Sequence, residues 1–334
     1  TFVAANCDVT KAVLTVTAAA QTKVFGDAND ALTFQYSGWK NGNGIADLTT
    51  APTAGTTVTV TSPVSVYTNA ITLSGGADEN YSFTYVAANY EVTKAVLTVT
   101  ADSKSKVYGE ANPSLTFQYS GWLNGDDSGD LTTLPSASTT VSNTSAVGVY
   151  SGAITLSGGV DENYSFSYAT ASFTVTKATL TVTADAKTKV YGEANPVLTF
   201  QYSGWKNGNG IADLTTAPTA GTTVTVTSPV AVYTNAITVT GGVDENYSFT
   251  YVAANNDVTK AVLTVTADAK TKVYGEANPA LTLQYSGWMN GDNTGDLTTL
   301  PTASSTLTVT SPVNTYTGDI TLTGGVDENY DFSY

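Results

Sequence analysis

The chain has 334 residues and a formal net charge of −15, with 28 acidic residues, 13 lysines, no arginine and no histidine. Phosphate recognition needs a basic face, so this composition argues against a nucleic-acid partner. The missing histidine removes the commonest general base and transition-metal ligand, and the single Cys7 excludes an internal disulfide or a zinc site. No run of eighteen apolar residues occurs, so no membrane span is predicted.

The predicted elements recur with a constant period. The phrase KVYGEANP begins at Lys106, Lys189 and Lys272, and an altered copy, KVFGDAND, begins at Lys23, each 83 residues after the previous one. One tryptophan and one DENY stretch per period keep the same spacing. We therefore predict the end of a preceding repeat at residues 1–8, repeat one at 9–91, repeat two at 92–174, repeat three at 175–257, and repeat four at 258–334 without its last strand.

Within each repeat, alternating apolar residues predict short strands and an all-β fold. In repeat three the predicted strands are Ala178–Ala184, Lys187–Tyr191, Val197–Gly204, Thr222–Thr227, Val232–Thr240 and Asn246–Val252. Their predicted inward-facing residues are Leu180, Val182, Leu198, Phe200, Tyr202 and Phe249. Only Gly210–Ala220 resembles a helical turn, with Asp213 as its cap and Pro218 after it.

The opening phrase itself predicts a turn. Gly192 permits a positive φ after the strand that ends at Tyr191, and Asn195 before Pro196 favours extended backbone. The NGNG stretch at Asn207 predicts a second turn of this kind. Repeated turns need no chemistry to explain them.

Consecutive repeats are joined by a segment without glycine or proline, Glu91–Ala101 at the first junction. Val92 and Leu97 fall on opposite parities, so the buried face is expected to switch near Lys94. One nearly continuous strand would then end one repeat and open the next. The prediction is a stiff array forming an elongated rod on the order of 100 Å long. Repeats one and three also share KNGNG, whereas two and four carry NGD, which indicates duplication of a two-repeat block.

These motifs together carry a family resemblance. The order VTKA, KVYGEANP, LTFQYSGW, TSPV and ENYSF resembles the MBG-type repeat of the YGX kind, found in tandem in bacterial surface and adhesin-like proteins. The resemblance covers all four copies and implies a small, mostly β, grasp-like domain without catalytic residues. Grasp and sandwich topologies both remain open. It implies a non-enzymatic, extracellular stalk or spacer of a cell-surface adhesin or filament.

A calcium site is one sharper hypothesis, with a solvated turn as the plainer alternative. Oxygen-bearing residues alternate as in a calcium loop, although Pro135 and Pro301 occupy the place of the terminal glutamate. The candidate ligands are Asn124, Asp126, Ser128 and Asp130 in repeat two, and Asn290, Asp292, Thr294 and Asp296 in repeat four. The DENY acids, such as Asp161 and Glu162, suggest a second oxygen site. No other cofactor is predicted.

The tryptophans suggest binding of surface glycans, because parity places Trp205 outward beside a polar loop. The alternative is that each ring packs over the loop. The candidate residues are Trp39, Trp122, Trp205 and Trp288. A carbohydrate-binding or adhesion module is therefore the second functional reading.

Two covalent modifications are also conceivable from the sequence. A lysine at each junction and an asparagine on each late strand suggest isopeptide pairs, formed by Lys94, Lys177 and Lys260 with Asn80, Asn163 and Asn246. The same asparagines and Asn143 fit the N-glycosylation pattern. Exposed lysines and chance matches are the plainer readings.

The two ends suggest association. Thr1–Asp8 aligns with Thr250–Asp257, the closing strand of repeat three, and Tyr334 aligns with Tyr251. We expect a window of a longer protein whose copies or further repeats join head to tail. The Val3–Thr10 segment would supply the edge beside Asn329–Tyr334, by covalent continuity or by strand donation. Cys7 is read as a variable turn position.

Overall fold

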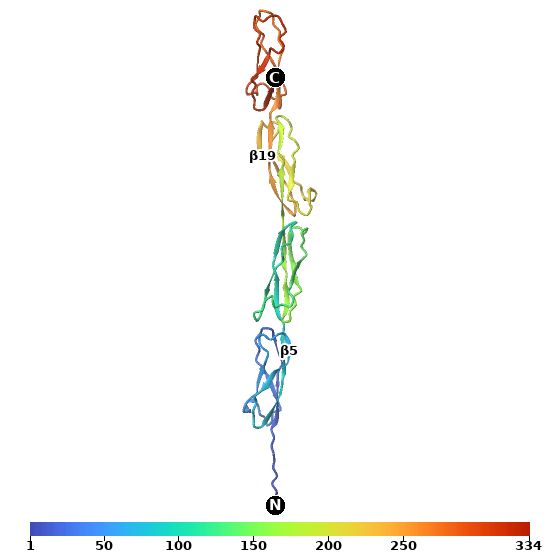
Figure 1. Ribbon diagram of the computed structural model, residues 1–334, viewed down its shortest axis with the longest axis vertical. Helices are drawn as coiled ribbons and strands as arrows, with labels where there is room; N and C mark the ends of the chain where they lie inside the picture. Colours follow the sequence, from blue (N-terminus) through green and yellow to red (C-terminus); the bar gives the residue numbers. More distant parts are fainter. The chain divides into compact units, whose positions relative to one another are not determined.

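The computed structural model describes residues 1–334 and consists of β-strands, two short 3-10 turns and loops. The chain forms two compact units, each of which contains two repeats. Figure 1 colours the repeats in chain order, from blue at the N-terminus to red at the C-terminus. The first unit holds Thr1–Lys106, Ala111–Ser142 and Gly148–Val175, and the second holds Val107–Glu110, Asn143–Val147 and Thr176–Tyr334. The structure contains no helix whose length and hydropathy would let it span a membrane.

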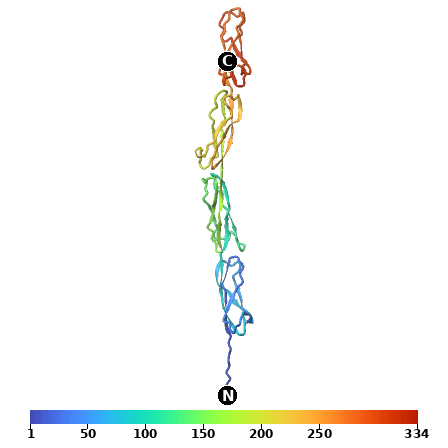
Figure 2. The same ribbon diagram turned by 180° about the vertical axis from the view of Figure 1, so that it is seen from behind.

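Repeat three shows the complete set of elements. These are β15 (Ala178–Ala184), β16 (Lys187–Val190), β17 (Phe200–Ser203), η2 (Ile211–Asp213), β18 (Thr219–Thr222), β19 (Ala231–Thr240), β20 (Tyr247–Val252) and β21 (Ala254–Thr259). Figure 2 shows from the opposite side that strands run along the length of each repeat. The predicted helical turn is reduced to η2, in which Asp213 Oδ2 accepts a hydrogen bond from the Gly210 amide at 2.7 Å.

The same elements recur in the other repeats. Repeat one contains β1 (Ala12–Ala18), β2 (Gln21–Val24), β3 (Phe34–Ser37), η1 (Ile45–Asp47), β4 (Thr53–Thr56), β5 (Ser65–Ser74), β6 (Tyr81–Val86) and β7 (Ala88–Thr93). Repeat two contains β8 (Ala95–Ala101), β9 (Lys104–Val107), β10 (Phe117–Ser120), β11 (Ser136–Thr139), β12 (Gly148–Ser157), β13 (Tyr164–Ala169) and β14 (Ala171–Thr176). Repeat four contains β22 (Ala261–Ala267), β23 (Leu283–Ser286), β24 (Thr302–Ser304), β25 (Thr321–Thr323) and β26 (Tyr330–Ser333).

Two sheets build each complete repeat. In repeat three, one sheet has the order β17-β15-β20, with β15 antiparallel to β17 and parallel to β20. The other has the order β16-β21-β19-β18, with β16 parallel to β21 and the remaining pairs antiparallel. A single core joins them, because Val182 of the first sheet and Ile237 of the second belong to one buried cluster. The repeat is therefore sandwich-like, and no α-helix crosses a sheet as a grasp would require.

The predicted inward face is confirmed. Leu180 and Val182 are fully buried, while Leu198, Phe200, Tyr202 and Phe249 are half-buried at the edge of the same core. The intervening Thr199, Gln201 and Ser203 are exposed. The tapering burial follows from the size of the repeat, which is too small to cover every inward side chain.

One predicted strand is wrong. Thr222–Thr227 alternates like a strand, yet the strand ends at Thr222. The backbone carbonyls after Thr222 accept hydrogen bonds from side chains instead of from a neighbouring strand. Asn195 Nδ2 donates to the Val224 carbonyl at 2.5 Å, and the buried Lys189 Nζ donates to the Thr225 carbonyl at 2.6 Å. Backbone groups that side chains satisfy are no longer available to a ladder.

The segment that joins repeats one and two follows the predicted parity. β7 ends at Thr93 with Val92 buried, and β8 begins at Ala95 with Leu97 buried. Lys94 alone separates the two strands. The buried face therefore switches where it was expected, and the last strand of one repeat leads directly into the first strand of the next.

Repeat four keeps one sheet and opens the other. Its first sheet has the usual order, β23-β22-β26, but its second is reduced to the pair β24-β25. Residues 270–273, which correspond to β16, form no strand, and neither do residues 314–320, which correspond to most of β19. No part of this chain lies between these two segments in the way that β21 lies between β16 and β19.

Candidate functional site: the contact between consecutive repeats

The Tyr-Gly step of KVYGEANP contacts the next repeat. Tyr191 packs edge-on against Tyr330 with ring centroids 5.7 Å apart, and its hydroxyl donates to Asp292 Oδ2 at 3.0 Å. Gly192 has φ +81°, and a Cβ there would overlap the side chain of Met289. Glycine is thus required both by the turn and by the close approach.

A backbone amide completes this contact. The Val230 N–H donates to Asn329 Oδ1 at 2.9 Å, so the asparagine of the DENY stretch binds the preceding repeat. Ring packing, a hydroxyl and an amide thus act at one junction. Three different kinds of contact therefore join repeat three to repeat four.

The first unit repeats this arrangement with one difference. Phe25 packs edge-on against Tyr164 at 5.6 Å, and the Val64 N–H donates to Asn163 Oδ1 at 3.0 Å. Asp126 Oδ2 accepts the Tyr164 hydroxyl at 2.9 Å, as Asp292 Oδ2 accepts that of Tyr330 at 2.8 Å. Phe25 has no hydroxyl and so cannot make the second bond, which Tyr191 makes to Asp292. A small cavity of about 340 Å³ lies here, lined by Phe25, Thr61, Asn124, Asp126, Asp130, Leu131, Asp161, Asn163 and Tyr164.

The second unit contains another example of the contact. Tyr108 packs against Tyr247 at 5.7 Å, and its hydroxyl donates to Asn209 Oδ1 at 3.1 Å. The Val147 N–H donates to Asn246 Oδ1 at 2.9 Å. An exposed Lys206–Glu110 pair at 3.4 Å adds little, because solvent screens it. The acceptor of the tyrosine hydroxyl therefore alternates between a carboxylate and an amide.

Burial sets the electrostatics of these contacts. It raises the pKa of Tyr164 to about 12, and the Asp126 carboxylate that accepts its hydrogen bond adds to this effect. Burial also lowers the pKa of Lys189, whose Nζ donates to the carbonyls of Glu193 and Thr225 at 2.8 and 2.6 Å. The lysine of KVYG therefore fixes the turn that carries Tyr191.

The tryptophans lie beside this contact. The parity argument for Trp205 is wrong, because Gly204 with φ +102° breaks the alternation. Its ring is half-buried, 5.2 Å from Tyr202 and 5.5 Å from Tyr247. Trp39, Trp122 and Trp288 pack in the same way, as the packing alternative expected. A binding role for the four rings stays a prediction.

Three of the four candidate calcium ligands of repeat two, Asn124, Asp126 and Asp130, line the same small cavity, but the candidate carboxylates accept hydrogen bonds from within the protein. Asp126 and Asp292 accept tyrosine hydroxyls, whereas Asp130 Oδ2 accepts the Asp127 N–H and Asp296 Oδ2 accepts the Asn293 N–H. Asn124 and Asn290 occupy positive-φ turn positions, and Ser128 and Thr294 are exposed. No group of three or more acidic residues is placed to hold a metal ion. These loops are hydrogen-bonded turns, and calcium binding by them stays a prediction.

The suggested lysine–asparagine pairs are not formed. Lys94, Lys177 and Lys260 each donate to the carbonyl of a DENY aspartate at 2.6 to 2.7 Å. Asn163 and Asn246 instead accept amides from the preceding repeat. Asn80 and Asn143, the other matches to the glycosylation pattern named above, are exposed.

Sequence reasoning missed the role of the Tyr-Gly step. It assigned KVYG to a turn, which is correct, but it did not place Tyr108 or Tyr191 against a neighbour. The sequence did carry one signal: an aromatic residue precedes the glycine of every KVYG or KVFG turn, and a turn does not itself require an aromatic residue. Cys7 was also misread, because its equivalents Tyr90, Phe173 and Asn256 are fully buried strand residues.

The fold and the repeated contact define a tandem array of β-sandwich repeats. The family model described as MBG domain (YGX type) matches residues 14–91, 97–174, 180–256 and 263–334. The chain therefore belongs to this family, whose repeats are found in surface proteins. No curated protein and no solved structure matches the chain.

Proposed function

We propose that the chain is a non-catalytic structural segment, a stalk or spacer, of an extracellular surface adhesin or filament. The observation that supports this most is the contact repeated in both units: an aromatic ring, a glycine and an asparagine-bound amide at equivalent positions. A spacer that carries a distal part away from a surface needs each repeat to hold the next in one orientation. Because these groups make the contact between repeats, no further function is needed to explain why the KVYG turn recurs.

The proposal is tested by a distance measurement across one junction. Spin labels replace the exposed Thr179 and Val262, equivalent positions in repeats three and four, in a chain whose Cys7 is changed to Ser. We expect a narrow distance distribution by pulsed electron resonance, and a broad one after Tyr191→Ala with Asn329→Ala. A broad distribution in the parent chain would contradict a spacer function.

Location is tested separately. Intact cells of the source that carry the full protein are treated with an external protease, and the fragment is followed with an antibody against residues 175–334. Cleavage without lysis is the expected result for a surface protein. Protection of the segment until the cells are opened would contradict the proposal.

Carbohydrate binding is the weaker candidate. Each tryptophan ring is half-buried and packs against two tyrosines, for example Tyr36 at 5.3 Å and Tyr81 at 5.4 Å for Trp39, which reduces the ring surface open to a sugar. Binding on a glycan array that is lost in Trp205→Ala would overturn this preference.

The partner we propose is another array of the same kind. Copies or further repeats would join head to tail through the contact that already links the repeats of each unit.

A further inference from the structure

We propose that the paired tyrosines at two junctions are a site of oxidative cross-linking. Tyr108 would couple to Tyr247 at the second junction, between repeats two and three, and Tyr191 to Tyr330 at the third, between repeats three and four. Each product is a dityrosine, and the co-reactant is a one-electron oxidant that draws on a peroxide. Such bonds would stiffen the spacer proposed above, but their formation needs only the geometry of the junctions.

The two rings of each pair are in contact and shielded from solvent. The ring centroids are 5.7 Å apart in both pairs, and the ring planes are nearly perpendicular. The four side chains are only 2% to 6% exposed. A bond between two phenol rings is itself twisted, so the steep angle does not oppose coupling. A radical formed on one ring therefore meets the other tyrosine rather than a second molecule.

The two hydroxyls of each pair converge on one oxygen atom. Asp292 Oδ2 accepts the hydroxyl of Tyr191 at 3.0 Å and that of Tyr330 at 2.8 Å. At the second junction both hydroxyls lie 3.1 Å from Asn209 Oδ1. A tyrosyl radical carries much of its unpaired electron on the ring carbons next to the oxygen. The shared acceptor therefore keeps the reactive edges of the two rings close together.

The reaction balances between the pair and the oxidant. Each tyrosine gives one electron to the oxidant and passes its phenolic proton along the hydrogen bond. The two radicals then form one carbon–carbon bond between ring positions next to the hydroxyls. Each of these carbons loses its hydrogen as a proton while the oxygen regains one, which restores both phenols. The pair has then lost two electrons and two protons, which convert one hydrogen peroxide into two water molecules.

A row of aromatic rings connects each buried pair to less buried side chains. In repeat four, the ring centroids of Tyr285, Trp288 and Tyr330 follow one another at 5.5 and 5.6 Å, and Tyr191 comes next at 5.7 Å. Repeat three has an equivalent row. Tyr285 and Trp288 are half-buried, so a small oxidant in solution reaches them. Tyrosine and tryptophan lose single electrons readily, and rings in contact exchange them, so the buried pair can be oxidised without touching the oxidant.

The first junction provides an internal comparison. Its row of rings has similar spacing but ends in Phe25, which packs on Tyr164 at 5.6 Å. Phenylalanine has no phenolic hydroxyl and forms no tyrosyl-type radical. We therefore expect cross-links at the second and third junctions and none at the first.

The test oxidises residues 1–334 at low protein concentration with a photoexcited ruthenium complex and persulfate, which removes single electrons from tyrosine. Peptide mass spectrometry then locates dityrosine by the loss of two hydrogens from a joined pair of peptides. We expect one cross-link within the chain at each of the two junctions. The yield should be higher at the third, because the Asp292 carboxylate is a better proton acceptor than the Asn209 amide. Asn209→Asp should accordingly raise the yield at the second junction several-fold.

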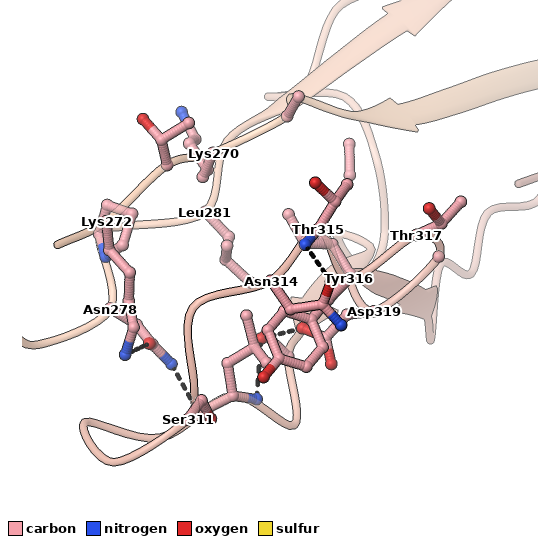
Figure 3. A pocket seen from close by; sticks show the side chains of 18 of the residues that line it. Lys270, Lys272, Asn278, Leu281, Ser311, Asn314, Thr315, Tyr316, Thr317 and Asp319 are labelled. Atoms are coloured by element: carbon pink, nitrogen blue, oxygen red, sulfur yellow. Dashed lines mark hydrogen bonds between the residues drawn. The ribbon is translucent and has the colours of Figure 1, made fainter. Parts of the chain in front are cut away.

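Tyr316 is the control for an accessible but unpaired tyrosine. Figure 3 shows it among the polar residues that line a pocket of repeat four. It is 38% exposed, and its hydroxyl donates to the Pro312 carbonyl at 2.9 Å instead of sharing an acceptor with another tyrosine. It should form no cross-link within the chain, although the oxidant reaches it more easily than it reaches the buried pairs.

Two further variants move the reaction. Tyr191→Phe keeps the ring but should remove the cross-link at the third junction and leave the second unchanged. Phe25→Tyr should create a new cross-link to Tyr164, a gain that misfolding cannot produce. Coupling that appears only between chains, that spares both junction pairs, or that persists at these pairs in concentrated urea would overturn the proposal. The spin-label distances across repeats three and four are measured without oxidant and are independent of these outcomes.

Discussion

A hydroxyl added at Phe25 should strengthen the first junction. The ring of Phe25 lies 5.6 Å from Tyr164 in the same edge-on geometry as Tyr191 on Tyr330, and Asp126 occupies the place of Asp292. In Phe25→Tyr the new hydroxyl should therefore donate to Asp126 Oδ2. A hydrogen bond to a charged acceptor adds about 1.5 kcal/mol to the free energy of unfolding at the low end of its range. The low end applies because the Asp126 carboxylate is only half-buried.

The assay is urea unfolding in a chain that keeps only Trp122, with the other tryptophans changed to Phe. Trp122 packs on Tyr164 at the junction and reports its loss by fluorescence. With a slope of about 2 kcal/mol per molar urea, the midpoint should rise by about 0.7 M. An unchanged midpoint, or a gain that survives Asp126→Ala, would refute the reasoning.

Four other predictions concern the same contacts and the core of repeat three. Tyr191→Phe should destabilise the second unit by about 1.5 kcal/mol and Tyr108→Phe by about 1 kcal/mol, because the acceptors are a carboxylate and an amide, as single-tryptophan unfolding curves will show. Asn163→Ala should cost about 1 kcal/mol in the same assay, whereas the exposed Asn80→Ala should be neutral. Phe200→Ala should cost about 3 kcal/mol, since the ring is half-buried, and a neutral result would mean that the inward face is misassigned. Burial raises the pKa of Tyr164 to about 12, so its contribution to the free energy of unfolding is complete below pH 10 and is lost as the pH rises toward 12. Denaturation curves measured across this pH range should show a smaller loss of stability in Tyr164→Phe.

The sequence was sufficient for the repeats and for most of their strands. Alternation placed Leu180 and Val182 correctly because those strands form one wall of a closed core. It failed at Thr222–Thr227, where Lys189 and Asn195 donate hydrogen bonds to the backbone carbonyls. The alternation of residues within a segment carries no information about side chains that reach it from elsewhere in the sequence. It failed again at Trp205, since parity does not continue through a residue such as Gly204 with positive φ.

The contact between repeats was only partly predictable. Parity located the switch at Lys94, but it carried no information about which side chains meet across it. The alternation of KNGNG and NGD was attributed to duplication, and the structure adds a physical difference: Asn209 receives the hydroxyl of Tyr108, whereas Asp292 receives that of Tyr191. Neighbouring contacts therefore differ in charge although their geometry is alike.

The parallel pairs of each complete repeat determine how it would respond to a pulling force. In repeat one, the first strand, β1, runs parallel to β6 and the last strand, β7, runs parallel to β2, so each end strand is bonded to a strand from near the opposite end of the repeat. Tension applied at Ala12 and Thr93 would load these ladders along the strand direction, and many hydrogen bonds would have to break together rather than one after another. A repeat built in this way resists traction at its ends more strongly than its modest core alone would allow.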